Sequence, residues 1–213
     1  MNMDLKSIFF DIEEHLLNDN KPSIHVEKLL EDGLLKEYPF SMIGDLKEVP
    51  QNPKYHPEGD VFIHTMMVID EGAKNREKSK NKRAFMWALL LHDIGKKPTT
   101  KNRKGKLTSY SHDSVGQKMT REFLNYFNED EEFINEVCGL VRWHMQSLFV
   151  NKSLPFQDIK GMLKEVDKNE IVLVALSDRL GRGRIRHGDV NDTLEDINKF
   201  KKILNKSDCK SEK

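Results

Sequence analysis

The residues best suited to chemistry are an adjacent imidazole and carboxylate, His92 and Asp93. They follow the apolar run 84–91, Ala-Phe-Met-Trp-Ala-Leu-Leu-Leu, and precede Ile94, a glycine and two lysines. Burying such a pair is costly unless something compensates it, and a divalent metal ion binds a neutral imidazole and an ionised carboxylate together. For the dipeptide alone two interpretations stay open: a metal-ligand pair, or a packed histidine beside an aspartate at a helix end.

Four further residues extend the pattern along the chain, at positions that face inward on predicted helices or begin them: His64, His112, His144 and Asp178. Each histidine alone is more often a packed core residue than a ligand. Together, four histidines and two aspartates favour a divalent metal centre. The mixed ligands suit Mn, Fe, Co, Ni or Zn, and Mg less well.

Asp93 has two carboxylate oxygens, so it could bridge two ions. The first ion would then take His64, His92, Asp93 and Asp178, and the second Asp93, His112 and His144. Whether one or two ions bind stays open. A metal ion in this setting makes water a nucleophile at neutral pH, so Asp93 is also a catalytic candidate.

Three cations near these positions are candidates for binding a phosphate. Lys96 follows Asp93 by about one helical turn and could contact a phosphate oxygen, as a catalytic or substrate-binding residue. It could equally be a solvated lysine at a helix C-terminus, where the helix dipole favours it. Arg182 lies about one turn beyond Asp178 and is the stronger candidate for both roles, because its planar guanidinium matches phosphate oxygens. Arg179 is a substrate-binding candidate that could instead pair with surface acids.

The elements that must position these side chains are predicted to be helices. Apolar residues at three- and four-residue spacing indicate helices over 3–18 and 23–36, a helix capped by Asp60, a central helix over about 83–95, and later helices from Ser111, near Glu129, and over 159–166, 170–178 and 189–204. The intervening segments 39–59, 74–83 and 96–106 are expected to be an irregular loop and two solvated basic loops, with no β-hairpin.

We therefore expect an all-α protein with a single helical domain over 1–204. Residues 1–50 would form a helical extension packed on it, and 205–213 a disordered tail. The chain has 213 residues, with 35 basic and 35 acidic ones, and this zero net charge argues against a general nucleic-acid coat. No apolar stretch approaches the ~20 residues of a membrane span. The two cysteines, Cys138 and Cys209, favour a reducing cytoplasm over a disulfide-bonded protein.

Several separated motifs carry a resemblance to a known family: residues 50–61 leading to His64-Thr65, then 91–96, Ser111-His112, Trp143-His144 and 177–182. In this order they resemble the HD-domain superfamily of metal-dependent phosphohydrolases, with the nearest likeness to the HD domain at the C-terminal end of bacterial CCA-adding tRNA nucleotidyltransferases. The resemblance covers roughly 26–200. It implies an all-helical bundle with the metal site at its centre, and hydrolysis of phosphoesters in nucleotides or RNA ends. No Gly-Ser motif followed by paired carboxylates precedes these residues, so the resemblance does not imply nucleotide addition.

The favoured function is thus phosphomonoester or phosphodiester hydrolysis by metal-activated water. The substrate would be a nucleotide, a cyclic nucleotide or another phosphorylated small molecule, or the phosphate at an RNA or tRNA end. An alternative is a di-iron oxygenase acting on a small molecule, because some HD-superfamily members use a similar set of four histidines and two aspartates. A third is a nucleotide-binding module without turnover.

Overall fold

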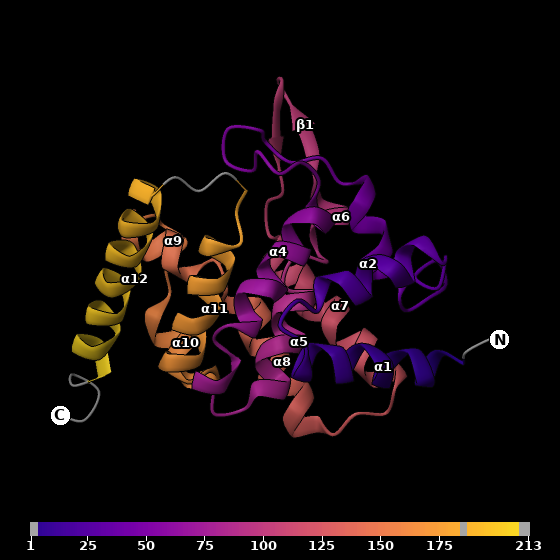
Figure 1. Ribbon diagram of the computed structural model, residues 1–213. Coiled ribbons are helices and arrows are strands. Elements are labelled where there is room, and N and C mark those ends of the chain that lie inside the picture. Colours follow the sequence, from indigo (N-terminus) through magenta and orange to yellow (C-terminus); the bar gives the residue numbers. More distant parts are fainter. Residues whose placement is uncertain (1–3, 184–186, 209–213) are drawn as a thin grey trace.

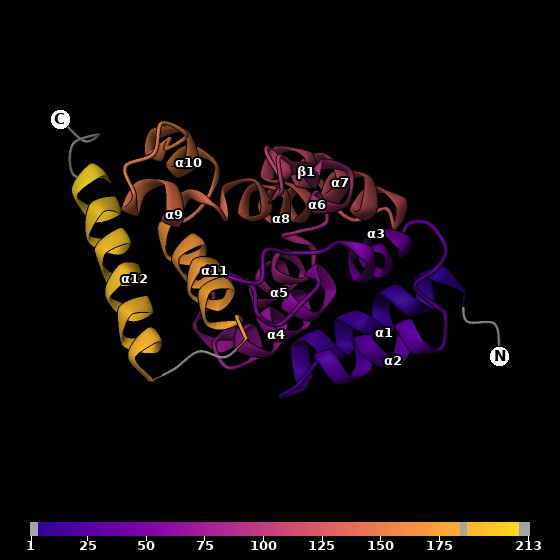
Figure 2. The same ribbon diagram turned by 90° about the horizontal axis from the view of Figure 1, so that it is seen from above.

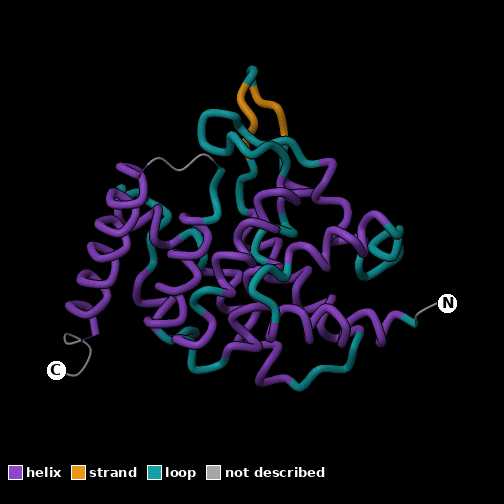
Figure 3. The backbone as a smooth tube through the Cα atoms, in the orientation of Figure 1, coloured by secondary structure: helices purple, strands orange, loops and turns teal. Residues whose placement is uncertain are grey.

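The computed structural model describes residues 4–183 and 187–208, and helices make up most of it (Figures 1 and 3). In chain order the α-helices are α1 (Leu5–Asn18), α2 (Ser23–Glu31), α3 (Ser41–Gly44), α4 (Val61–Ala73), α5 (Lys82–Leu91), α6 (Lys96–Thr99), α7 (His112–Tyr126), α8 (Glu131–Trp143), α9 (Gln146–Asn151), α10 (Ile159–Glu165), α11 (Lys168–Leu180) and α12 (His187–Asp208). Two short 3₁₀ helices are η1 (Asp45–Glu48) and η2 (Arg76–Lys78). The predicted all-α class is confirmed. Among the described residues, none of the helices has the length and apolar character needed to cross a membrane.

Helix α5 is the centre of the molecule. All eight residues from Ala84 to Leu91 are buried, and the helix packs against α1, α4, α8 and α11 (Figure 2). A helix that is apolar on every side must be surrounded by other elements. The chain leaving α5 therefore emerges inside the bundle, and its next two residues are His92 and Asp93. The helix ends at Leu91 rather than near residue 95, so this pair lies in a turn.

The N-terminal helix contributes to the same core. Phe9 of α1 stacks on Trp87, with 4.5 Å between ring centroids, and on Phe127, at 4.4 Å. The indole Nε1 of Trp87 donates a 2.8 Å hydrogen bond to Glu13 of α1. One continuous cluster of buried apolar residues extends from Ile8 to Leu204.

The basic segment 96–106 is more ordered than the sequence pattern predicted. It begins with α6 and continues into an antiparallel hairpin of β1 (Lys101–Arg103) and β2 (Lys106–Thr108), drawn in orange in Figure 3. The sequence analysis predicted no β-hairpin, and this prediction was wrong. Lys104 and Gly105 have φ of 53° and 78°, the left-handed backbone that a two-residue hairpin turn needs. Most strand residues are exposed, so the sequence lacks the apolar alternation that identifies a half-buried strand.

Two other loop predictions are corrected. The segment 39–59 contains α3 and η1 before it becomes irregular. The segment 74–83 is only partly solvated, because Arg76 is buried and donates hydrogen bonds to the backbone oxygens of Leu16 and Asp19. At the other end of the chain, α12 continues through residues 205–208, which were predicted to belong to the tail. The rest of that predicted tail, 209–213, lies outside the described residues.

Candidate metal centre

The structure brings the six predicted ligand residues together in the interior. All six are buried, and they come from α4, the turn after α5, the start of α7, the turn after α8, and α11. They form two groups in which the candidate ligand atoms lie within 4.8 Å of one another. The groups are His64, His92 and Asp178, and Asp93, His112 and His144.

Three of the imidazoles are oriented by backbone carbonyls three residues earlier in the chain. Nδ1 of His92, His112 and His144 each donates a 2.7 Å hydrogen bond, to the oxygens of Leu89, Ser109 and Val141 respectively. A carbonyl oxygen can only accept, so the proton of each neutral ring must be on Nδ1. Nε2 of each ring therefore carries a lone pair, which is the form that binds a metal ion.

The contact between two of these rings is the clearest indication of a cation site. Nε2 of His112 lies 3.2 Å from Nε2 of His144. With both protons held on Nδ1, two lone pairs face each other, and only a shared proton or metal ion makes that contact favourable. Two Zn–N bonds of about 2.0–2.1 Å can span this separation. Nε2 of His92 is likewise buried without a hydrogen-bond partner among the described residues.

Asp93 lies between the two groups, and its two oxygens face different histidines. Oδ2 is 3.2 Å from Nε2 of His92, whereas Oδ1 is 3.5 Å from Nε2 of His112 and 3.8 Å from that of His144. Burial alone would raise the pKa of this carboxyl group, but the proximity of His92 and of the Lys96 ammonium outweighs burial and holds the pKa well below its usual range. The side chain is thus an anion that presents one oxygen to each group.

His64 is oriented by a carboxylate that the sequence analysis did not identify. Its Nδ1 lies 3.1 Å from Oε1 of Glu58, and its Nε2 lies 3.1 Å from Oδ1 of Asp178. Burial would lower the pKa of His64, but its bonds to Asp178 and Glu58 raise it overall. Without a metal ion this ring, between two carboxylates, therefore takes up a proton more readily than a free imidazole does. A metal ion at Nε2 would leave the contact between Nδ1 and Glu58 in place.

The second histidine group has the opposite protonation tendency. Burial, followed by the proximity of the His112 and His92 imidazoles, lowers the pKa of His144 to about 4. Burial also lowers the pKa of His112. Both rings are consequently neutral near pH 7, as metal ligands must be.

A cavity of about 650 Å³ opens onto the two groups and is also lined by the three predicted cations. Nζ of Lys96 lies 2.7 Å from Oδ2 of Asp93 and donates to Oε1 of Gln51 at 2.9 Å. Nη2 of Arg182 lies 3.7 Å from Oδ2 of Asp178. Arg179 also lines the cavity, but its Nη2 is 2.8 Å from Oδ2 of Asp196 on α12. Lys96 and Arg182 thus face the candidate centre, and Arg179 has an acidic partner outside it.

Gly95 allows the turn with His92 and Asp93 to lie directly against the start of α7. A Cβ at this position would be 2.1 Å from the backbone oxygen of His112 and 2.5 Å from the backbone nitrogen of Gly116. Backbone atoms cannot move aside cheaply, so only glycine fits. The same close approach brings His112 within reach of Asp93.

Glu58 and Gln51, the two supporting residues that sequence reasoning missed, lie in the irregular segment before α4. This segment has no periodicity from which the direction of a side chain can be inferred. The sequence held one signal for Glu58, because it is an acidic residue in a proline-rich loop only two positions before Asp60. Asp60 caps α4, since its side chain accepts a hydrogen bond from the backbone N–H of Ile63.

The chain is similar to several known proteins. Residues 61–183 match the model of the HD domain family. Similar proteins include the Multifunctional CCA protein of Haemophilus influenzae, 37% identical over 131 residues, which are 58% of this chain and 31% of that protein. The protein of the same name from Mannheimia succiniciproducens is 30% identical over 176 residues, 79% of this chain and 41% of its own length. That from Pasteurella multocida is 28% identical over 189 residues, 85% and 44% of the two lengths. The chain thus spans less than half the length of these relatives.

Proposed function

Because the chain belongs to the HD domain family, whose members are metal-dependent enzymes, we propose that it hydrolyses phosphoesters of nucleotides or RNA ends. The observation that carries the proposal is Asp93, a buried anion whose two oxygens face two histidine groups beneath an open cavity. The short distance between Nε2 of His112 and Nε2 of His144 independently supports a cation bound between these two rings.

In this proposal His64, His92, Asp93 and Asp178 would hold one divalent ion, and Asp93, His112 and His144 would hold a second. Bound ions would supply a water molecule acidified toward hydroxide and would polarise the phosphoryl oxygens. Glu58 keeps the proton of His64 on Nδ1, so that Nε2 remains directed at the centre.

The cavity's cations would bind the substrate phosphate. An ammonium group has three donors, and Lys96 directs Nζ at Asp93 and Gln51, which leaves one donor for a phosphate oxygen. Arg182 has a buried Nε with no hydrogen-bond partner among the described residues, and it would bind further phosphoryl oxygens as negative charge develops. Arg179 is the third candidate, and its pair with Asp196 must open before it can contribute.

An RNA end is the preferred substrate within this class, because of the surface beside the cavity. The hairpin exposes Lys101, Arg103, Lys104 and Lys106 to solvent. Tyr110, which lines the cavity, is 61% exposed, and the Arg103 guanidinium lies 4.7 Å from its ring centroid. Clustered cations with an exposed aromatic ring suit a phosphate backbone and an unstacked base. The similarity to the Multifunctional CCA proteins is a second reason for this choice.

The test is hydrolysis of 2′,3′-cyclic, 2′-, 3′- and 5′-nucleotides and of RNA oligonucleotides with the same end groups, with Mn, Co, Ni or Mg. His92→Ala and Asp93→Ala should each abolish both metal binding and hydrolysis, whereas the exposed Asp32→Ala should change neither. Full phosphoesterase activity in either of the first two variants would refute the site assignment. Tight nucleotide binding without turnover in the wild type would instead indicate a binding module.

An oxygenase remains the second candidate function, because four imidazoles and two carboxylates also suit iron. Purification without oxygen, iron analysis and oxygen uptake with small alcohols or phosphonates would distinguish the two. Oxygen consumption coupled to substrate loss, with no phosphate released, would favour the oxygenase.

A further inference from the structure

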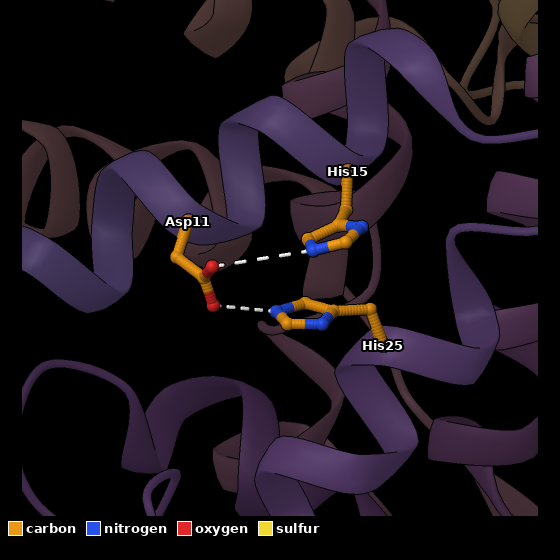
Figure 4. Close-up of side chains that lie close together, drawn as sticks. All are labelled: Asp11, His15 and His25. Atoms are coloured by element: carbon orange, nitrogen blue, oxygen red, sulfur yellow. Dashed lines mark hydrogen bonds and ion pairs between the residues drawn. The ribbon is translucent and has the colours of Figure 1, made fainter.

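Two histidines and an aspartate also meet far from the buried centre, between α1 and α2 (Figure 4). Nε2 of His25 lies 2.6 Å from Oδ2 of Asp11, and Nε2 of His15 lies 4.0 Å from Oδ1 of the same carboxylate. We propose that Asp11, His15 and His25 form a second metal site, for a borderline divalent ion of the Zn²⁺ class. It shares no residue with the candidate centre around Asp93.

The two rings present the same nitrogen to the same place. They stack with centroids 3.6 Å apart and planes inclined by 17°, and in Figure 4 both Nε2 atoms point toward Asp11. Nδ1 of His15 lies 2.7 Å from Oδ2 of Asp19, so this nitrogen donates its proton to that carboxylate. In the neutral ring the lone pair is then on Nε2, facing Asp11. A carboxylate behind an imidazole in this way is the usual support of a metal-binding histidine.

The cluster is also held in place by contacts from the rest of the protein. The guanidinium of Arg76, in η2, donates to the backbone oxygens of Leu16 and Asp19 and so fixes the end of α1 that carries His15. Ser23, the first residue of α2, bonds through its backbone N–H and its hydroxyl to Asp70 of α4, at 3.1 and 2.8 Å. His25 is therefore positioned two residues from an anchored helix start. Ligands that are fixed before the ion arrives bind it more tightly.

The composition and exposure of the cluster select the class of ligand. Two imidazoles and one carboxylate are typical of Zn²⁺ and its neighbours rather than Ca²⁺ or Mg²⁺, which prefer oxygen ligands. The side chains are 17–33% exposed, so an ion can enter from solvent and keep water in its remaining positions. For an ion to bind at Nε2 of His25, the proton shared with Asp11 must leave that nitrogen, and the neutral ring then carries its one proton on Nδ1.

Imidazole ¹⁵N NMR of the full-length protein during Zn²⁺ titration tests this site separately from the buried centre. The Nε2 resonances of His15 and His25 should shift together as one ion binds. Asp11→Asn should weaken this response at least about tenfold. Glu14→Gln removes the same charge from an exposed position on α1 and should leave the response unchanged.

The wild-type spectrum decides the question even if a variant folds poorly. If His15 and His25 do not respond while His92 and His144 do, the second site is refuted. Equal loss of the response in Asp11→Asn and Glu14→Gln would also refute it, because the effect would then be one of general charge.

Discussion

At the scale of single residues, Glu58 determines how the buried His64 can be used. The carboxylate lies within hydrogen-bonding distance of His56 Nδ1, at 2.9 Å, and of His64 Nδ1, at 3.1 Å, and its other oxygen accepts from the backbone of Gly183. Burial opposes its ionisation, but the bonds from His56 and His64 hold the pKa of Glu58 below its usual range. A permanent anion behind His64 fixes the proton on Nδ1.

Glu58→Gln should therefore lower metal affinity about 10–100-fold while the protein remains folded. The amide keeps a similar shape but loses the charge that selects the Nδ1–H form of His64. Calorimetric metal titration measures the change, and circular dichroism confirms folding. The control is Glu48→Gln, which removes an exposed carboxylate that pairs with Lys97. Equal affinities in wild type and Glu58→Gln would contradict the positioning role of Glu58.

How far the candidate site could be predicted depends on where each residue lies. His64 and Asp178 lie on helices with apolar faces, so their inward direction follows from the spacing of their neighbours. Glu58 and Gln51 lie on a loop, where only the folded path of the chain decides what a side chain faces. The bonds of His92 and His144 to carbonyls were also beyond prediction, because they depend on where a helix ends.

At the scale of elements, the turn after α5 and the first turn of α7 must touch for His112 to reach Asp93. Gly95 makes this contact possible. The hairpin turn contains another glycine, Gly105, which has a positive φ but no atom within 4 Å of a Cβ built there. A substitution at Gly95 therefore tests crowding at the site, whereas a substitution at Gly105 tests backbone strain at the surface.

Gly95→Ala should destabilise the fold and weaken metal binding, because the added methyl group pushes α7 and His112 away from Asp93. Gly105→Ala should leave metal binding unchanged and cost only the strain of a left-handed alanine, about 1 kcal/mol. Urea unfolding and metal titration of both variants test this. Wild-type metal affinity in Gly95→Ala would show that the close approach is not needed.

The N-terminal cap of α11, the helix that carries Asp178 near its other end, gives a prediction about how stability depends on pH. Asp167 caps this helix, accepting from the backbone N–H of Asn169 at 2.7 Å, and lies 2.5 Å from Nζ of Lys80. Burial opposes its ionisation, but the Lys80 hydrogen bond and the backbone bonds lower the pKa of Asp167 overall. On acidification, Asp167 therefore takes up a proton at a higher pH in the unfolded chain than in the folded protein. Its contribution to the free energy of unfolding is complete above about pH 4 and is lost as the pH falls through the lowered pKa of the folded state.

Asp167→Ala should accordingly lower the free energy of unfolding by about 1 kcal/mol at pH 7, and by less at pH 3. Urea unfolding at both pH values measures the difference. Asp32→Ala, at an exposed helix C-terminus, should have little effect at either pH. An Asp167→Ala effect that stayed constant down to pH 3 would show that the ionised carboxylate is not the stabilising form.

At the scale of the whole molecule, α1 and α2 share the core of the other helices. Phe9 lies between Trp87 and Phe127, so the N-terminal helices and α5 bury one another. The sequence predicted both the helices and their apolar faces. It could not predict how tightly residues 1–50 are joined to the rest, because that depends on long-range contacts such as those of Arg76 and Trp87.

Phe9→Ala should lower the free energy of unfolding by about 3–5 kcal/mol and keep a single transition. Phe10→Ala, on the same helix but 49% exposed, should cost much less. Circular dichroism, together with fluorescence of a Trp143→Phe background in which Trp87 alone reports, follows the unfolding of both parts. Separate transitions for the two signals would show that the N-terminal helices are an independent unit.

The bonds of His92 and His144 to Leu89 and Val141 have an evolutionary consequence. The last carbonyls of a helix lack partners within it, and these imidazoles satisfy one such carbonyl in α5 and one in α8. A descendant that exchanged either histidine for another ligand would also lose a helix terminator. Substitutions at these two positions are thus penalised twice, and the liganding pattern is harder to change than the cavity above it. New substrates are more easily acquired through the hairpin and the loop before α4 than through the centre itself.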